Sequence, residues 1–200
     1  MLTVVYLRGY GLKRAGANRS LAALIARLDP QVFGVCEIDA GDALAIATRF
    51  AMQWGYRGGQ AVFWKPRFTA LTIRDEYLPF SAARPFERRG LLRIALRNER
   101  EHIKMVATQI GSERDVRIRE LRHLRNALRE ERDPCVVFSI LPPGRIGLED
   151  LGFKRAGCLG VDNEAIYTRG FAIKEAYDDN HTHPGLGTPI VAGLRIIPKG

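Results

Sequence analysis

Several features that would assign this sequence to a special class of protein are missing from it. None of its apolar runs approaches the roughly 20 residues that a membrane-spanning helix needs. Residues 1–7 carry no basic segment and run directly into a strand-like pattern, so neither a signal peptide nor a membrane partner is expected. Internal repeats and low-complexity segments are also missing, which argues against a solenoid or a disordered tail.

Cysteine is scarce as well. The three cysteines, Cys36, Cys135 and Cys158, are an odd number and have no C-x-x-C spacing. Two of them lie in apolar runs. We therefore expect buried, reduced thiols in a cytoplasmic protein.

Acidic residues are outnumbered by basic ones, 22 to 31, which leaves a formal net charge of +9. Such a balance favours polyanionic partners, either nucleic acid or a phosphorylated ligand. The basic residues are spread along the chain rather than gathered in one block. An alternative therefore stays open, in which exposed positions carry arginine without any ligand.

What is present indicates an α/β protein with a single domain over residues 1–200. Its 46% hydrophobic content is enough for one sizeable core. A helix expected after Gly41 places Leu44 on its apolar face and ends near Gly55. The most regular helix is expected from about Glu113 to Arg132. Arginines cover most of its surface, and its apolar stripe consists of Ile118, Leu121, Leu124 and Leu128.

The stretch from Leu28 to Asp39 carries the first functional signal. Pro30 ends a helix, because the residue before a proline avoids the α region. Residues 32–36 then form a largely apolar run, short enough for a strand that is buried on both faces. Glu37 follows at the tip of this strand, where a carboxylate is poorly placed for a core residue and well placed for a metal ligand.

Five segments, taken in order, resemble those of a known family. Residues 28–39 resemble a segment that ends in a metal-binding Glu, and residues 87–93 resemble the start of a strand with an Arg-Gly pair. Residues 106–111 are similar to an Asn-Thr-His-Leu strand, residues 161–162 to an Ile-Asp pair, and residues 189–192 to a final Pro-Val-Val-Ala strand. The family is the endonuclease/exonuclease/phosphatase superfamily, the metal-dependent phosphoesterases related to abasic-site endonucleases and deoxyribonuclease I.

This resemblance, which extends over nearly the whole chain, implies a fold and a chemistry. The fold class is α/β, a two-sheet α/β sandwich of the endonuclease/exonuclease/phosphatase type with the active site at one edge of the sheets. The family's chemistry uses a divalent cation, which polarises the phosphate and is held by oxygen ligands. An Asp or a bound hydroxide supplies the nucleophile, and a His–Asp pair stabilises charge on the phosphate.

The chain departs from that pattern at most catalytic positions. Glu37 matches the metal-binding Glu, and Asp162 matches the Asp that orients the family's histidine. The residues that stand at the replaced positions are Arg8, Gln109, Ser139, Leu141, Leu186 and Gly187. Arg8 brings positive charge instead of an oxygen ligand, and Gln109 can form hydrogen bonds but cannot take a proton at neutral pH. Both are candidates for binding a substrate.

We therefore expect a catalytically impaired protein that binds nucleic acid or a phosphorylated ligand and needs no cofactor. Losing one acid/base group costs ~10²–10⁴ in rate, and here several groups that act as a unit are lost together. The first alternative is an active phosphodiesterase or phosphatase, such as a nuclease, with a rebuilt site that uses Mg²⁺ or Mn²⁺. The second is a protein-interaction module without a phosphate ligand.

A rebuilt site would draw on residues 178–183. His181 and His183, together with Glu37 or Asp162, could bind zinc or manganese or replace the lost histidine. A solvated loop is the simpler interpretation of these residues.

At Glu37, an ion pair with Arg8 is expected to take the place of the cation, because a guanidinium supplies a fixed positive charge and paired donors. The arginines of residues 114–132 could lie along a phosphate backbone, although the acidic residues dispersed among them also fit a solvated face.

Overall fold

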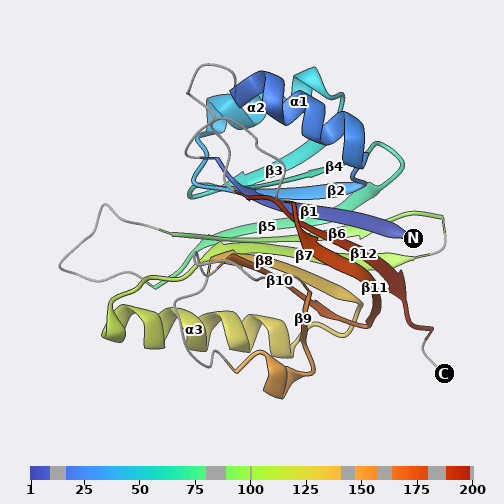
Figure 1. Cartoon of the computed structure of the whole chain (residues 1–200). Helices are drawn as coiled ribbons and strands as arrows, with labels where there is room; N and C mark the ends of the chain where they lie inside the picture. The colour runs from blue at the N-terminus through green and yellow to red at the C-terminus, as the bar shows by residue number, and fades with distance from the viewer. Residues whose placement is uncertain are drawn as a thin grey trace.

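Two six-stranded sheets pack face to face, with α1 and α2 over the outer face of one and α3 over the outer face of the other (Figure 1). The computed structural model describes residues 1–9, 17–79, 89–99, 101–140, 147–156, 164–179 and 188–198. Within these ranges, no helix is long and apolar enough to cross a membrane. The α/β class and the two-sheet sandwich expected from the sequence are confirmed.

The first sheet has the strand order β11-β12-β1-β2-β4-β3 and the second the order β5-β6-β7-β8-β10-β9. The strands of the first sheet are β1 (Leu2–Arg8), β2 (Val32–Cys36), β3 (Gln53–Arg57), β4 (Gln60–Trp64), β11 (Phe171–Asp178) and β12 (Ile190–Ile196). Those of the second are β5 (Thr69–Tyr77), β6 (Gly90–Arg97), β7 (His102–Gln109), β8 (Cys135–Ile140), β9 (Lys154–Ala156) and β10 (Glu164–Arg169). The helices are α1 (Ala17–Leu28), α2 (Ala40–Arg49) and α3 (Arg114–Arg129), and a 3-10 turn, η1 (Glu149–Leu151), precedes β9.

One edge of the sandwich collects the ends of its parallel strands. β1 and β2 run parallel, as do β7 and β8, and parallel neighbours need a crossover connection. Helices α1 and α3 lie in these two crossovers. The antiparallel strands β4 and β10 begin where β2 and β8 end. The terminal residues brought to this edge are Arg8, Cys36, Gln60, Gln109, Ile140 and Glu164.

The two sheets share a core made from every second residue of their strands. Gly34 of β2 allows the sheets to approach closely, because a Cβ there would stand 2.7 Å from the Cγ atom of Phe138 in β8. The Phe138 ring also stacks on Tyr6 of β1, with ring centroids 5.5 Å apart. The opposite faces of the sheets form separate apolar clusters beneath the helices.

The buried face of α3 differs from the expected one. Its buried residues are Val116, Glu120, Leu124, Ala127 and Leu128. Ile118 is 47% exposed, so its assignment to the apolar stripe is wrong. At 3.6 residues per turn, Ile118 lies about 200° around the helix from Val116. From the sequence, Glu120 was expected on the exposed face of the helix, whereas its side chain is buried.

The region after α2 also differs from the expected one. Gly55 lies inside β3 and does not end a helix, since α2 stops at Arg49. A Cβ on Gly55 would stand 2.9 Å from the Cδ1 atom of Ile94, so the glycine permits close packing of β3 on β6. Leu44 is 54% exposed, and α2 instead buries Ala43, Ile46 and Ala47.

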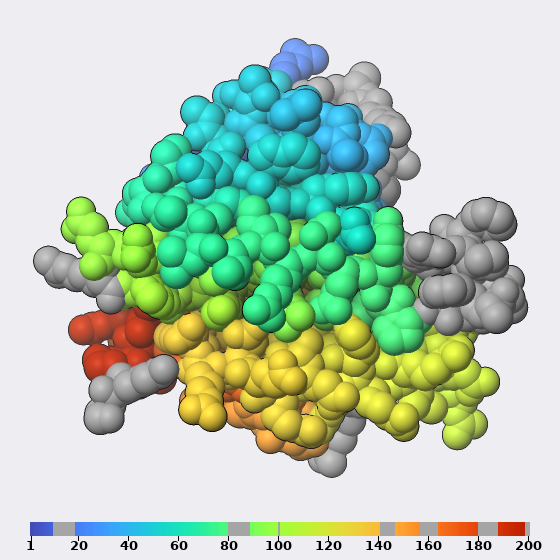
Figure 2. Space-filling model, turned by 180° about the vertical axis from the view of Figure 1, so that it is seen from behind, coloured from blue at the N-terminus to red at the C-terminus, as the bar shows by residue number. Residues whose placement is uncertain are grey.

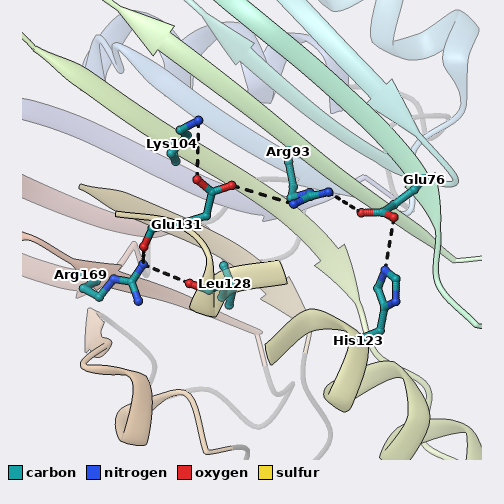
Figure 3. A network of polar contacts seen from close by, with 7 residues as sticks. All are labelled: Glu76, Arg93, Lys104, His123, Leu128, Glu131 and Arg169. Atoms are coloured by element: carbon teal, nitrogen blue, oxygen red, sulfur yellow. Dashed lines mark hydrogen bonds and ion pairs between the residues drawn. The ribbon is translucent and has the colours of Figure 1, made fainter. Parts of the chain in front are cut away.

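A network of ion pairs holds α3 and Glu131, two residues beyond its end, against β5, β6 and β7 (Figure 3). Arg93 of β6 donates a hydrogen bond of 2.9 Å to Glu76 of β5, and Nε2 of His123 in α3 lies 3.3 Å from the same carboxylate. Glu131 lies 4.0 Å from Arg93 and 3.6 Å from Lys104 of β7. Single pairs of this exposure contribute little to stability, but together they fix the side of α3 that faces β5.

Glu120 joins α3 to the end of β7 from a buried position. Its carboxylate accepts a hydrogen bond of 2.6 Å from the backbone N–H of Gly111 and lies 3.3 Å from Nη1 of Arg89. Burial raises the pKa of Glu120 above its ordinary value, while the bond from Gly111 and the Arg89 charge lower it by less. Burial therefore disfavours the ionised Glu120 carboxylate by more than Gly111 and Arg89 stabilise it.

We expect Gly90→Ala to destabilise the protein by about 3 kcal/mol, because overpacking at a rigid contact cannot relax. A Cβ at Gly90 would stand 2.2 Å from the backbone oxygen of Arg57 on the facing sheet. Urea unfolding measures the effect. The control is Gly41→Ala in α2, where the nearest atom to the new Cβ is 3.4 Å away. That variant should match or exceed the wild type, since alanine favours a helix. Equal stability of the two variants would contradict the prediction.

Stability should also report the burial of Glu120 through its pH dependence. The raised pKa means that the folded protein holds this proton at a pH where the unfolded chain has released it. The free energy of unfolding should then fall as the pH rises from about 4.5 through the folded-state pKa. Glu120→Gln cannot titrate, so its stability relative to the wild type should improve between acidic and neutral pH. A difference that stays constant with pH would refute this assignment.

Candidate functional site

Polar side chains face the space between the sheets at the edge where the strands end. Tyr6 and Cys36 belong to the core that the two sheets share. Every second residue of a strand lies on the same face. By this alternation Arg8 follows Tyr6, Gln109 follows Ala107, Gln60 precedes Val62 and Glu164 precedes Ile166, all on the inter-sheet face.

Arg8 lies between two carboxylates that come from different sheets. Its Nε atom is 2.9 Å from Oε1 of Glu164 in β10 and 3.5 Å from Oε2 of Glu37, which follows β2. The side chains of Arg8, Glu37 and Glu164 are 22%, 32% and 8% exposed. The ion pair expected between Arg8 and Glu37 is therefore present, and a second carboxylate shares the same guanidinium.

Glu37 has an unusual backbone conformation. Its φ of 57° lies in the left-handed region, which side chains other than glycine and asparagine seldom adopt. Hydrogen bonds on both sides hold it, from Gly9 N–H to the Cys36 oxygen at 2.7 Å and from Ile38 N–H to the Gly59 oxygen at 3.3 Å. A carboxylate held at such a position suggests a task for the side chain.

Two glutamines complete the inner wall of this edge. Gln109 at the end of β7 donates to Oε1 of Glu37 across 3.4 Å, a second contact between the sheets. Gln60 at the start of β4 is fully buried, and neither of its side-chain polar atoms has a hydrogen-bond partner among the described residues. Unpaired buried amides are costly, so Gln60 marks a polar position without an obvious structural role.

Burial and neighbouring charge raise the pKa of both Tyr6 and Cys36. Burial is the largest cause in each case, Glu164 adds to both increases, and Arg8 opposes them. Neither the phenol nor the thiol ionises near neutral pH in this environment. Cys36 and Cys135 are buried and free, as the sequence predicts, and Cys158 lies outside the described residues.

The structure places Ser139 away from this edge. Ser139 alternates with Val137 and Cys135, which belong to the apolar cluster beneath α3. The residue of β8 that faces the space between the sheets is Ile140. The alignment that placed Ser139 at a catalytic position is therefore shifted by one residue along the strand. The side chain that faces the space between the sheets is the apolar Ile140.

Several residues proposed from the sequence cannot be placed. Asp162, His181 and His183 lie outside the described residues, as do Leu141, Leu186 and Gly187. Glu164, by contrast, was missed by sequence reasoning and lies against Arg8. A carboxylate directly before the apolar run Ala165–Tyr167 was the signal that could have found it.

The described residues do not fit a divalent cation with Arg8 in this position. Hard cations need several oxygen ligands around a common centre. In the described part of the chain, no group of three His, Cys, Asp or Glu side chains is arranged to hold a metal ion. The two carboxylates at this edge both have the Arg8 guanidinium as a partner. Glu37 as a metal ligand stays a prediction.

Comparison with known proteins identifies the fold. No family model matches the sequence, and a search of curated proteins finds no match. An endonuclease/exonuclease/phosphatase protein of Bacteroides vulgatus superposes with a TM-score of 0.81 at 10% identity, covering 98% of this chain and 99% of that one. The mannosyl-6-phosphatase of Bacteroides thetaiotaomicron gives 0.78 at 10% identity, covering 98% and 100%. TDP2 of D. rerio in complex with a single-stranded DNA product gives 0.71 at 12% identity, covering 97% and 98%. The chain has the endonuclease/exonuclease/phosphatase fold.

The backbone of Glu37 allows a matched pair of substitutions. Glu37→Ala and Glu37→Gly both remove the carboxylate, but only glycine accepts the left-handed conformation without strain. We expect the glycine variant to be more stable than the alanine variant by about 1 kcal/mol. At an ordinary exposed site the order would be reversed. Chemical denaturation of the two variants decides, and an alanine variant of equal or greater stability would show that residue 37 carries no such strain.

Proposed function

We propose that this chain is a catalytically impaired protein of the endonuclease/exonuclease/phosphatase fold that binds nucleic acid or a phosphorylated ligand. The observation that carries the proposal is the position of the Arg8 guanidinium between Glu37 and Glu164. A guanidinium supplies a permanent positive charge with fixed donors. It can neutralise these carboxylates as a cation would, but it cannot activate a water molecule as a bound metal ion does.

The side chains around Arg8 support the loss of hydrolysis. Gln109 cannot transfer a proton, and Ile140 offers no polar atom on the inward face of β8. Removing one acid/base group costs ~10²–10⁴ in rate. The losses reinforce one another, because a nucleophile, its base and the charge-stabilising groups act as a unit.

Two features support a phosphate-containing ligand. The chain carries a net charge of +9, which favours polyanions. Two of its structural neighbours are a mannosyl-6-phosphatase and TDP2 with a DNA product, so the fold accommodates phosphorylated compounds in those proteins.

An active enzyme with a rebuilt site is the second candidate. The left-handed backbone of Glu37 favours it, because strained residues gather at active sites. In that case Asp162, His181 and His183 would supply the missing groups, with Mg²⁺ or Mn²⁺ as cofactor. Against it, both described carboxylates at this edge are already paired with Arg8.

Hydrolysis of a generic phosphodiester, such as bis-p-nitrophenyl phosphate, separates the two candidates. With Mg²⁺ or Mn²⁺ present, we expect the wild type to hydrolyse it no faster than Glu37→Gln does. A wild-type rate that Glu37→Gln lowers ~10²-fold or more would reject the impaired site and support the rebuilt one.

Titration of the wild type and of Arg8→Asn with Mn²⁺ tests whether Arg8 stands in the place of a cation. Arg8→Asn leaves Glu37 and Glu164 without their shared guanidinium, so this variant should bind Mn²⁺ more tightly than the wild type. Equal Mn²⁺ affinity of the two proteins would show that Arg8 does not stand in the cation's place.

A further inference from the structure

The exposed face of α3 has an excess of positive charge. Between Asp115 and Glu130 the chain contains five arginines and a single acid, Glu120. Because Glu120 is buried against Gly111, it contributes no negative charge to the solvent-facing side. Of the two acids in α3 only Asp115 is exposed, so the exposed surface of α3 is more basic than its sequence suggests.

Most of these arginines have no acidic partner. Arg125 lies 3.6 Å from Asp150, and Nε of Arg119 donates only to the backbone oxygen of Asp115. Among the described residues, no carboxylate forms an ion pair with Arg114, Arg117, Arg122 or Arg129. Unpaired arginines on a folded helix are free to contact an external anion.

Three exposed arginines line the side of α3 that points away from the sheet. At 3.6 residues per turn, Arg119, Arg122 and Arg129 fall within a sector of about 80°. This sector lies opposite the buried residues Leu124 and Ala127. Figure 1 shows α3 along the outer side of the second sheet, on the far side of the molecule from α1 and α2.

Two of the neighbouring acids on the β5 side are already engaged, and Glu130 lines the hollow beside them. Glu76 is paired with Arg93 and His123, and Glu131 with Arg93 and Lys104 (Figure 3). A hollow of about 280 Å³ lies beside them, lined in part by Arg74 of β5, which has no ion-pair partner among the described residues. Seen from behind, β5 lies directly above α3 on one face of the molecule (Figure 2).

Like charges lie next to one another along α3, and Asp150 offsets only the charge of Arg125. Arg122 and Arg125 are three residues apart and Arg125 and Arg129 four apart, so their side chains are neighbours on the helix surface. Each such pair destabilises a helix slightly. A polyanion laid along the helix would turn this repulsion into attraction.

We propose that Arg119, Arg122 and Arg129 bind the phosphate backbone of double-helical nucleic acid. The inference rests on the nucleic-acid part of the proposed function. The described residues at the Arg8 edge carry two carboxylates and one guanidinium, so they offer no net positive charge to phosphates. α3 contains no Phe, Trp or Tyr on which unpaired bases could stack, which favours a duplex over a single strand.

Salt-dependent binding of labelled duplexes tests the surface. The test variant is Arg119→Gln/Arg122→Gln/Arg129→Gln. The control variant, Arg19→Gln/Arg49→Gln/Arg195→Gln, removes the same number of charges from α1, α2 and β12. We expect the test variant to bind at least about tenfold more weakly at ~0.1 M salt, and its plot of log K against log salt to be shallower by about 2–3. The control should keep a slope close to that of the wild type.

Duplex DNA and duplex RNA are titrated separately to identify the source of the backbone, and a single strand serves as competitor. Thermal unfolding accompanies each titration, and the test variant should melt no lower than the wild type, since repulsion is removed. Equal losses in the two variants, or a single strand that competes as well as a duplex, would overturn the α3 surface. A wild type that binds no duplex would also overturn it, while the phosphodiester assay would still decide the question of hydrolysis independently.

Discussion

The Arg8 guanidinium joins the two sheets at the edge where six strands begin or end. Arg8 belongs to the first sheet, and Glu164, its closer partner, belongs to the second. Glu37 and Gln109 make a second contact across the same gap. Two inward carboxylates at the mouth of an apolar interface would repel one another without a positive charge between them. In this chain the Arg8 guanidinium supplies that charge.

A resident cation has consequences for what the edge can do. A metal ion held by open coordination can exchange its water for a substrate oxygen, whereas a guanidinium offers only N–H donors, and the Nε atom of Arg8 lies near both Glu37 and Glu164. The inward side chain of β8 is Ile140, so the neighbouring strand adds no acid or base. The surface of α3 has the opposite character, because most of its arginines have no acidic partner within the described part of the chain. At the strand edge the charge of Arg8 is used within the fold, whereas the arginines of α3 are exposed to solvent. A strongly basic protein can therefore have an acidic strand edge.

The two-sheet sandwich was predicted from the resemblance to the endonuclease/exonuclease/phosphatase superfamily, and the approximate positions of helices and strands from local apolar patterns. The sequence placed Glu37 correctly at the tip of a strand and paired it with Arg8. It failed where a single polar residue is buried. Glu120 occupies a core position of α3, so a stripe chosen by apolarity alone moved to Ile118. The same bias hid Glu164, since an inward carboxylate is recognised only when its partner from another sheet is in place.

The second feature that the sequence did not predict was the direction in which a side chain points from its strand. An alignment of motifs places Ser139 near a catalytic position, yet successive residues of a strand point to opposite faces, and a shift of one residue exchanges them. Only the pairing of β8 with β7 and β10 shows that Ile140 faces the edge. Short motifs that end a strand are therefore weak evidence for catalytic groups, even when the fold they suggest is right.

The left-handed backbone of Glu37 is kept in place by the side-chain contacts of this edge. Glycine adopts a left-handed backbone conformation at the lowest cost. The nearby Gly58 and Gly59 both have such a positive φ. Retaining a glutamate instead costs roughly 1–2 kcal/mol of backbone strain. Its carboxylate offsets that cost through Arg8 and Gln109, which tie the end of β2 to both sheets. The contacts of the Glu37 carboxylate with Arg8 and Gln109 thus give this side chain a structural role at the edge of the sandwich.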